Sequence, residues 1–96
     1  MKLKIAVCDD DLQWSERIRQ SISEYMCHVN QQCDIQVFES GEELCGAFHG
    51  SHSFDIVFLD VDMDEMDGME TAEMIRSRSD QVTIVFITGV VEAAPR

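Results

Sequence analysis

Two short acidic runs carry the residues of this chain that could do chemistry. In FLDVDMDEMDGME, residues 58–70, an apolar run ends in six carboxylates within eleven residues. Near the start, Asp9, Asp10 and Asp11 follow the apolar run LKIAVC, residues 3–8. Carboxylate oxygens are the ligands that hard divalent cations prefer, so acids of this kind form a metal site if the fold brings them together.

Four apolar segments of the right length predict the strands that must position these acids: residues 3–8, 34–40, 55–60 and 82–88. The segment DIVFLD, residues 55–60, is apolar on both alternations, which is typical of a strand buried on both sides in a parallel sheet. The segment DIQVFES, residues 34–40, alternates apolar and polar residues as a half-exposed edge strand does.

Helical patterns separate these strands. The first has apolar residues at steps of three and four after Asp11, the second opens on a Ser-x-x-Glu capping box, and the third opens on an acidic cap. The apolar face of the first helix is predicted to be Trp14, Ile18, Ile22, Tyr25, Met26 and Val29. In the second helix, Leu44, Ala47 and Phe48 follow the cap residues Ser40 and Glu43. In the third, Met69, Ala72 and Ile75 form the apolar face, and Asp67 and Glu70 are the cap residues. Alternating strands and helices predict an α/β domain with a parallel sheet and right-handed crossovers.

The carboxyl ends of parallel strands are where ligands gather in such a fold. Asp9 and Asp10 close the first strand, Asp60 the third and Thr88 the fourth. If the first and third strands are neighbours, three carboxylates converge, and their mutual repulsion favours a bound cation such as Mg²⁺. The bland alternative, a solvated acidic loop with helix caps, accounts for the remaining acids: Asp11, Asp64, Glu65, Asp67 and Glu70.

Composition limits the partners and the compartment. The net charge of −12, from 19 acidic and 7 basic residues, argues against binding nucleic acid or an anionic membrane surface and favours cations or a basic partner face. No secretory signal and no apolar run of roughly 20 residues is found, so we expect a cytoplasmic protein that does not span a membrane.

The cysteines Cys8, Cys27, Cys33 and Cys45 contain no Cys-x-x-Cys pair and are expected to be reduced thiols that pack as small hydrophobic groups. The alternative is a zinc site built from these cysteines and the nearby histidines, although structural zinc sites usually show tighter paired spacing. The candidate ligands for it are Cys27, His28, Cys33, Cys45, His49 and His52.

Three motifs in this order, IAVCDDD, DIVFLDVDM with the following MDGME, and VFITG, resemble the receiver domain of two-component response regulators, with some leaning to the LytR/AgrA type. The resemblance runs from about residue 2 to residue 90. It implies a flavodoxin-like, doubly wound parallel sheet with strand order 2-1-3-4. The family continues with a further helix, strand and helix, so the domain at 1–96 is expected to be truncated at its C-terminus.

The resemblance also implies roles. Asp60 matches the phosphoacceptor, Asp9 and Asp10 match the acidic pair that holds Mg²⁺, and the backbone carbonyl of Asp62 is a further ligand. Thr88 matches the switch hydroxyl that binds the phosphoryl group. Structural roles fall to Gly89, a small residue beside the acceptor, and to Asp67 and Gly68 at the start of the third helix.

The function implied is signalling rather than enzymatic. A phosphohistidine on a sensor histidine kinase gives its phosphoryl group to Asp60 with Mg²⁺, for which Mn²⁺ can substitute, and some self-dephosphorylation follows. The change is relayed to an output domain outside this chain, expected to bind DNA and regulate transcription. The family lysine of the missing strand is absent, and Asp64 stands where the family usually has proline, so the loop is expected to be less rigid.

One further expectation follows from the truncation. With no fifth strand, the apolar fourth strand is an open edge, and the chain is expected to form homo-oligomers through it.

Two other classes compete with this interpretation. FLDVD also resembles the first motif of haloacid-dehalogenase-type phosphatases, in which Asp60 would be the nucleophile and Asp62 the general acid. An EF-hand calcium loop would use Asp60, Asp62 and Asp64, but its glycine and glutamate positions hold Glu65 and Thr71, and a strand rather than a helix precedes it.

Overall fold

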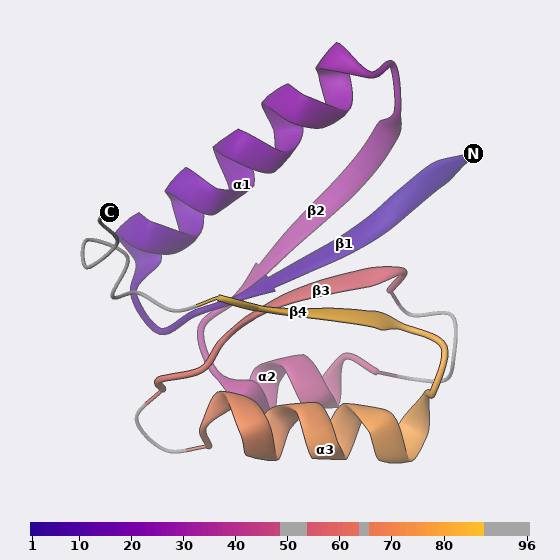
Figure 1. Ribbon diagram of the computed structural model, residues 1–96. Helices are drawn as coiled ribbons and strands as arrows, with labels where there is room; N and C mark the ends of the chain where they lie inside the picture. Colours follow the sequence, from indigo (N-terminus) through magenta and orange to yellow (C-terminus); the bar gives the residue numbers. More distant parts are fainter. Residues whose placement is uncertain (49–53, 64–65, 88–96) are drawn as a thin grey trace, which may run out of the picture.

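Strands and helices alternate along the chain in the computed structural model, which describes residues 1–48, 54–63 and 66–87 (Figure 1). The elements are β1 (Lys2–Cys8), α1 (Leu12–His28), β2 (Gln32–Phe38), α2 (Gly41–Gly46), β3 (Ile56–Asp60), α3 (Gly68–Arg78) and β4 (Thr83–Ile87). All four predicted strands form. The one predicted over 34–40 lies two residues earlier, because Ser40 serves as the N-cap of α2 instead of extending the strand.

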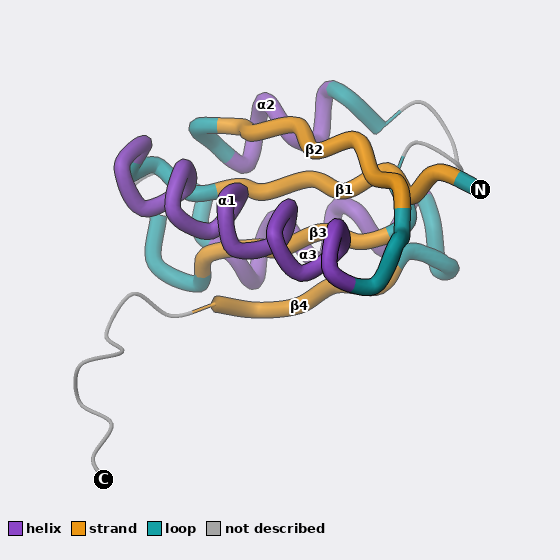
Figure 2. Tube along the Cα trace, turned by 90° about the horizontal axis from the view of Figure 1, so that it is seen from above, coloured by secondary structure: helices purple, strands orange, loops and turns teal. Residues whose placement is uncertain are grey.

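The strands form one parallel sheet in the order β2-β1-β3-β4, which confirms the expected topology (Figure 2). β1 is central, and its Ile5 pairs with Ile35 on one side and with Ile56 on the other. At the far end of the same ladder, Cys8 lies opposite Leu59. The residues that follow β1 and those that end β3 therefore lie at the same edge of the sheet, as the metal hypothesis requires.

The two faces of the sheet are covered unequally. α2 and α3 lie on one face and α1 alone lies on the other (Figure 1). The larger core, under α2 and α3, consists of Ala6, Cys8, Phe38, Leu44, Phe48, Phe54, Val57, Leu59, Ala72, Ile75 and Val82. Under α1 the buried hydrophobic residues of the described chain are Ile5, Val7 and Ile22, with partly buried residues such as Ile18, Met26 and Phe58 around them. Burial of apolar area therefore stabilises the α2/α3 side more than the α1 side.

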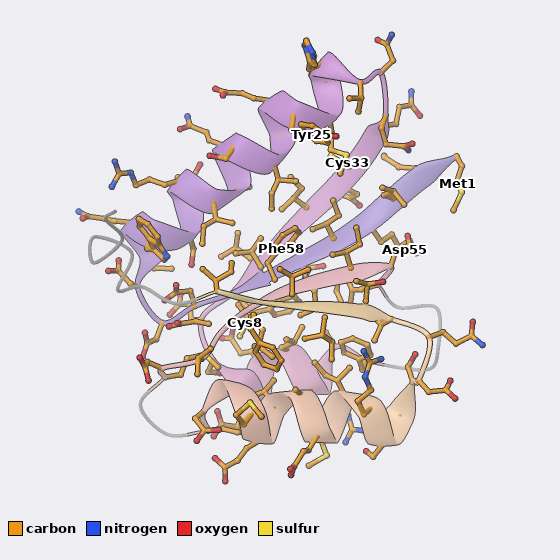
Figure 3. All side chains as sticks on the ribbon, viewed as in Figure 1. Met1, Cys8, Tyr25, Cys33, Asp55 and Phe58 are labelled. Atoms are coloured by element: carbon orange, nitrogen blue, oxygen red, sulfur yellow. The ribbon has the colours of Figure 1, made fainter. Side chains whose placement is uncertain are left out.

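Side chains alternate between these faces as strand geometry requires. Cys8 points toward α2 and α3, and Phe58 points toward α1 (Figure 3). All four cysteines are free: Cys8 and Cys45 are buried, Cys33 is half-buried and Cys27 is exposed. The expectation that they pack as small hydrophobic groups therefore fails for Cys27.

Two of the predicted helix faces need correction. Tyr25 and Val29 are 62% and 46% exposed, because Met26, one residue further along from Tyr25, takes the position facing the sheet. Met69 in the first turn of α3 is also exposed, while Ala72 and Ile75 are buried as predicted. Among the described helices, none combines the length and the apolar character needed to cross a bilayer.

Candidate functional site

Three carboxylates meet at the carboxyl end of the sheet. Asp9 and Asp10 follow β1, and Asp60 is the last residue of β3. One oxygen from each carboxylate can be chosen so that all three lie within 4.8 Å of one another. Asp9 and Asp60 are only 3% and 6% exposed, whereas Asp10 is open to solvent. The convergence that the strand order predicted is therefore present in the structure.

The loop after β1 holds Asp9 by several hydrogen bonds. The backbone N–H of Asp9 donates to the Phe38 carbonyl oxygen at 3.1 Å, and its carboxylate Oδ1 accepts from the N–H of Asp11 at 2.9 Å. Ser15 Oγ, buried in the first turn of α1, donates to the Asp9 carbonyl oxygen at 3.3 Å. Ser15 was not among the predicted site residues. The feature that could have indicated its role is a small hydroxyl residue next to Trp14, on the predicted inner face of the helix.

A close approach between α3 and the end of β3 positions Asp60. Its Oδ1 accepts from the N–H of Asp62 at 3.3 Å, and the N–H of Gly68 donates to the Val61 carbonyl oxygen at 3.1 Å. A Cβ at Gly68 would overlap the Asp60 carbonyl oxygen and lie 2.8 Å from Val61 Cα. Only glycine allows this contact, so Gly68 has the structural role that the resemblance implied.

The environment disfavours charge on the two buried carboxyl groups. Burial, with additional contributions from the carboxylates of Asp60 and Asp10, raises the pKa of Asp9 to about 6. Burial also raises the pKa of Asp60, and the nearby charges of Asp10 and Asp62 add to the rise. The hydrogen bonds from the N–H groups of Asp11 and Asp62 oppose these effects without cancelling them. The two buried carboxyl groups and the neighbouring Asp10 supply hard oxygen donors that fit a divalent cation, and such a cation would favour the charged forms of Asp9 and Asp60.

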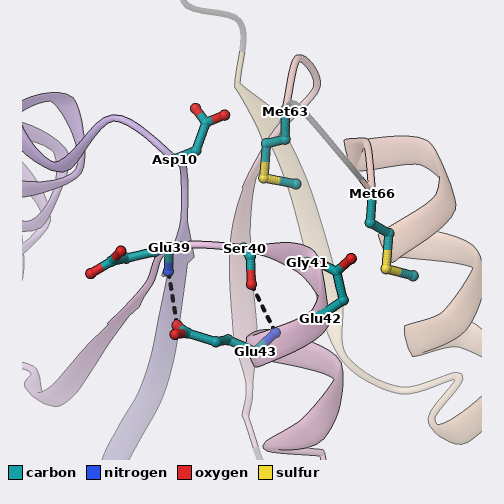
Figure 4. A pocket seen from close by; sticks show the side chains of 8 residues that line it. All are labelled: Asp10, Glu39, Ser40, Gly41, Glu42, Glu43, Met63 and Met66. Atoms are coloured by element: carbon teal, nitrogen blue, oxygen red, sulfur yellow. Dashed lines mark hydrogen bonds between the residues drawn. The ribbon is translucent and has the colours of Figure 1, made fainter.

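A pocket of about 540 Å³ opens beside this cluster (Figure 4). Its lining is mostly acidic and thioether side chains, together with Ser40 and Gly41: Asp10, Glu39, Ser40, Gly41, Glu42, Glu43, Met63 and Met66. Ser40 Oγ caps α2 by accepting from the N–H of Glu43 at 3.1 Å, as predicted. The Glu43 carboxylate accepts from the N–H of Glu39 rather than from that of Ser40, so the reciprocal bond of the capping box is displaced by one residue.

The remaining described acids of the two runs behave differently from the cluster. Asp11 accepts from the N–H groups of Gln13 and Trp14, which confirms it as the N-cap of α1. Asp67 and Glu70 form a reciprocal capping box at the start of α3. These carboxylates satisfy helix N–H groups, as the alternative of solvated caps proposed for them.

Several predicted site residues are not tested by this geometry. Thr88, Gly89 and Asp64 lie outside the described residues. The Asp62 side chain is exposed, and the role of its backbone carbonyl stays a prediction. Among the described residues, Asp9, Asp10 and Asp60 are the only group of three or more histidine, cysteine or acidic side chains close enough to share an ion, which leaves the zinc alternative without support there. A strand precedes Asp60, which counts against an EF-hand.

Comparison with known proteins identifies the family of this chain. The family model for the response regulator receiver domain matches residues 5–95. The chain therefore belongs to the response regulator receiver domain family. Domains of this family are phosphoacceptor signalling domains. The match does not favour the alternative of a haloacid-dehalogenase-type phosphatase.

Individual relatives agree. The response regulator VraR of Staphylococcus saprophyticus is 30% identical over 94 residues, which cover 96% of this chain and 42% of VraR. The response regulator TrrA of Thermotoga maritima, solved in complex with Mg²⁺ and BeF, is 29% identical with a TM-score of 0.77 and is matched over 96% of this chain and 73% of its own. The receiver domain of AraT from Geobacillus stearothermophilus is 30% identical with a TM-score of 0.74, and the match covers 96% of this chain and 68% of that one.

The extent of these matches matters. The chain spans about two fifths of the length of the VraR proteins that it matches, so it is short relative to those regulators. The finer expectation of a LytR/AgrA-type regulator stays a prediction, because these relatives do not test it. An acidic cluster in this chain and a Mg²⁺–BeF complex in a structural relative are together consistent with binding of a divalent metal.

Proposed function

We propose that Asp60 accepts a phosphoryl group from a phosphohistidine on a sensor histidine kinase. The metal ligands in this proposal are the carboxylates of Asp9, Asp10 and Asp60 and the backbone carbonyl of Asp62. The observation that carries it is the meeting of three carboxylates within 4.8 Å at the carboxyl end of the sheet, two of them buried. Mn²⁺ offers a similar preference for oxygen ligands and is expected to replace Mg²⁺.

Phosphoryl transfer requires mainly that the Asp60 carboxylate be correctly positioned. An oxygen of Asp60 attacks phosphorus, the new O–P bond forms as the P–N bond to the donor histidine breaks, and the histidine leaves and takes up a proton. Bound Mg²⁺ supplies neutralisation of the negative charge that the phosphoryl group brings to this acidic site. The N–H of Asp62 orients the Asp60 carboxylate, and burial of Asp60 limits access of water. In this proposal the hydroxyl of Thr88 binds the phosphoryl group. Slow hydrolysis of the acyl phosphate then returns Asp60 to its free form.

The partners follow from charge and from the relatives. A kinase that approaches the acidic end of the sheet needs a basic docking face, because the chain carries a net charge of −12. The output domain that receives the signal lies outside this chain and is proposed to bind DNA and regulate transcription. The pathway is proposed to operate in the cytoplasm.

The direct test is covalent modification by a small phosphodonor. Acetyl phosphate with Mg²⁺ should add one phosphoryl group to the chain, seen by intact-mass spectrometry, and Asp60→Asn and removal of Mg²⁺ should each abolish it. Asp67→Asn is the matched control, since it removes a neighbouring carboxylate that caps α3 and should leave modification intact. Phosphorylation that persists in Asp60→Asn would place the acceptor elsewhere and refute the assignment.

A further inference from the structure

A contact between two sulfur atoms links β1 to the loop between β3 and α3. Cys8 is the last residue of β1 and stands directly before Asp9. Met63 stands in the loop after β3, directly after Asp62. The Sγ atom of Cys8 lies 3.8 Å from the Sδ atom of Met63. The contact therefore lies next to predicted metal ligands of both elements.

Cys8 is the partner in this contact that belongs to the sheet. It is fully buried in the core under α2 and α3, and it pairs with Phe38 of β2 and Leu59 of β3. Its Sγ also lies 3.3 Å from the carbonyl oxygen of Ser40, the residue that caps α2. A thiol carries one proton, so Cys8 donates to that carbonyl and meets the Met63 thioether as a packing contact.

Met63 is the partner that belongs to the loop. The loop leaves the sheet at Val61, whose N–H donates to the Ile87 carbonyl oxygen at 3.0 Å and whose carbonyl oxygen accepts from the N–H of Gly68 at 3.1 Å. Between Val61 and Gly68, the Met63 side chain packs against the larger core and extends toward the pocket beside Asp10 (Figure 4). Met63 therefore ties the loop back to β1 one residue after the predicted carbonyl ligand.

The position of a backbone carbonyl matters most for a small cation. Mg²⁺ needs a near-ideal octahedron with metal–oxygen distances of about 2.0–2.1 Å, whereas Ca²⁺ accepts irregular coordination at about 2.3–2.6 Å. A carboxylate can turn about its side-chain bonds to follow an ion, but the carbonyl of Asp62 moves only with the loop. Anchoring the loop should therefore favour Mg²⁺ more than Ca²⁺.

We propose that the contact between Cys8 and Met63 positions the Asp62 carbonyl and thereby gives the acidic site a preference for Mg²⁺ over larger cations. Cys8 and Met63 are positioning residues, since they act through the ligands beside them and not on the ion. The inference rests on the metal site proposed above and adds the residues that set its choice of ion. Groups just outside a ligand set commonly change metal affinity by about 10–100-fold.

Calorimetric titration of the chain with Mg²⁺ and with Ca²⁺ tests this role. Met63→Ala should lower Mg²⁺ affinity about tenfold and Ca²⁺ affinity less than about threefold, because the released loop no longer holds the carbonyl at the short distance that Mg²⁺ needs. Met63→Leu should keep the wild-type preference, since leucine has nearly the volume of methionine and can pack against Cys8. Met74→Ala, the same change at an exposed position of α3, is the matched control and should change neither affinity.

Cys8→Ala removes the same contact from the side of the sheet and does not depend on the folding of Met63→Ala. It should lower the preference for Mg²⁺ by a similar factor, whereas Cys45→Ala, at the other buried cysteine, should not. Adding Met63→Ala to Cys8→Ala should have little further effect, because the effects of two residues in contact are not additive.

The possible results separate this inference from the proposed metal site. If Met63→Ala and Cys8→Ala keep the wild-type preference for Mg²⁺, or lose affinity for the two ions equally, the positioning role is overturned and the metal site stands. A wild-type chain that binds neither ion would overturn the metal site itself, and the positioning role with it.

Discussion

Asp9 and Asp60 differ from Asp11 and Asp67 in what their carboxylates contact, although all four come from the same two acidic runs. Asp11 accepts from two N–H groups of the α1 start and Asp67 from one of the α3 start, and both lie at helix N-termini, which favour negative charge. Asp9 and Asp60 each accept one N–H, are nearly fully buried and face one another and Asp10. Residue type alone therefore does not decide the role of an acid; its place at a helix start or at a strand end, and its degree of burial, do.

The largest expected difference between the two pairs is in metal affinity. Asp60→Asn and Asp10→Asn should each lower Mg²⁺ affinity about tenfold or more, equivalent to at least roughly 1.4 kcal/mol, because each removes a charged oxygen ligand. Asp11→Asn should leave affinity nearly unchanged, since asparagine also caps helices well. Isothermal titration calorimetry would measure all three. Equal losses in Asp11→Asn and Asp60→Asn would mean that general negative charge, rather than a defined site, binds the ion.

The second difference is in the sign of the stability change. Without metal, Asp9→Asn should stabilise the fold, because it removes a buried acid that lies among other acids. Asp67→Ala should destabilise it by about 1 kcal/mol, the usual cost of losing an N-cap. Urea unfolding in EDTA would give both values. Destabilisation by Asp9→Asn would show that the cluster is not electrostatically unfavourable, and the reason for expecting a cation there would be lost.

A smaller effect should appear in the pH dependence of stability. The pKa of Asp9 is raised to about 6 in the folded state from 3.8, so between these values the folded protein holds a proton that the unfolded chain has released. The free energy of unfolding of the metal-free protein should therefore fall as pH rises from about 4 to 6. Asp9→Asn should flatten this part of the curve, and Asp11→Asn should not. A wild-type curve that rises over this range would contradict the pKa assigned to Asp9.

Much of this comparison could be predicted from the sequence, because strand ends are local signals and the resemblance to receiver domains implied the strand order. Asp9, Asp10 and Asp60 each follow directly on an apolar run, and a parallel sheet places such residues together once β1 and β3 are neighbours. The caps at Ser40 and Asp67 could also be predicted, because they depend on residues three positions apart.

The rest depended on packing that spacing does not specify. The burial of Asp9 beside an exposed Asp10 results from the loop that Ser15 and Phe38 hold in place. Tyr25 and Met26 compete for one position on α1, and a helical period with 3.6 residues per turn does not decide between neighbours. The pocket next to Asp10 is lined by residues of α2 and of the loop after β3, which are distant in the sequence, so residue spacing does not predict it.

Manganese substitution tests the central claim, that the three carboxylates form one metal site, most directly. Crystals grown or soaked with millimolar Mn²⁺ should show a single strong anomalous difference peak at the carboxyl end of the sheet. The account predicts that carboxylate oxygens of Asp10 and Asp60 lie about 2.2 Å from it, with Asp9 beside them directly or through water. A peak bound instead at Asp67 and Glu70, or ordered Asp9, Asp10 and Asp60 side chains with no peak between them at saturating Mn²⁺, would contradict it.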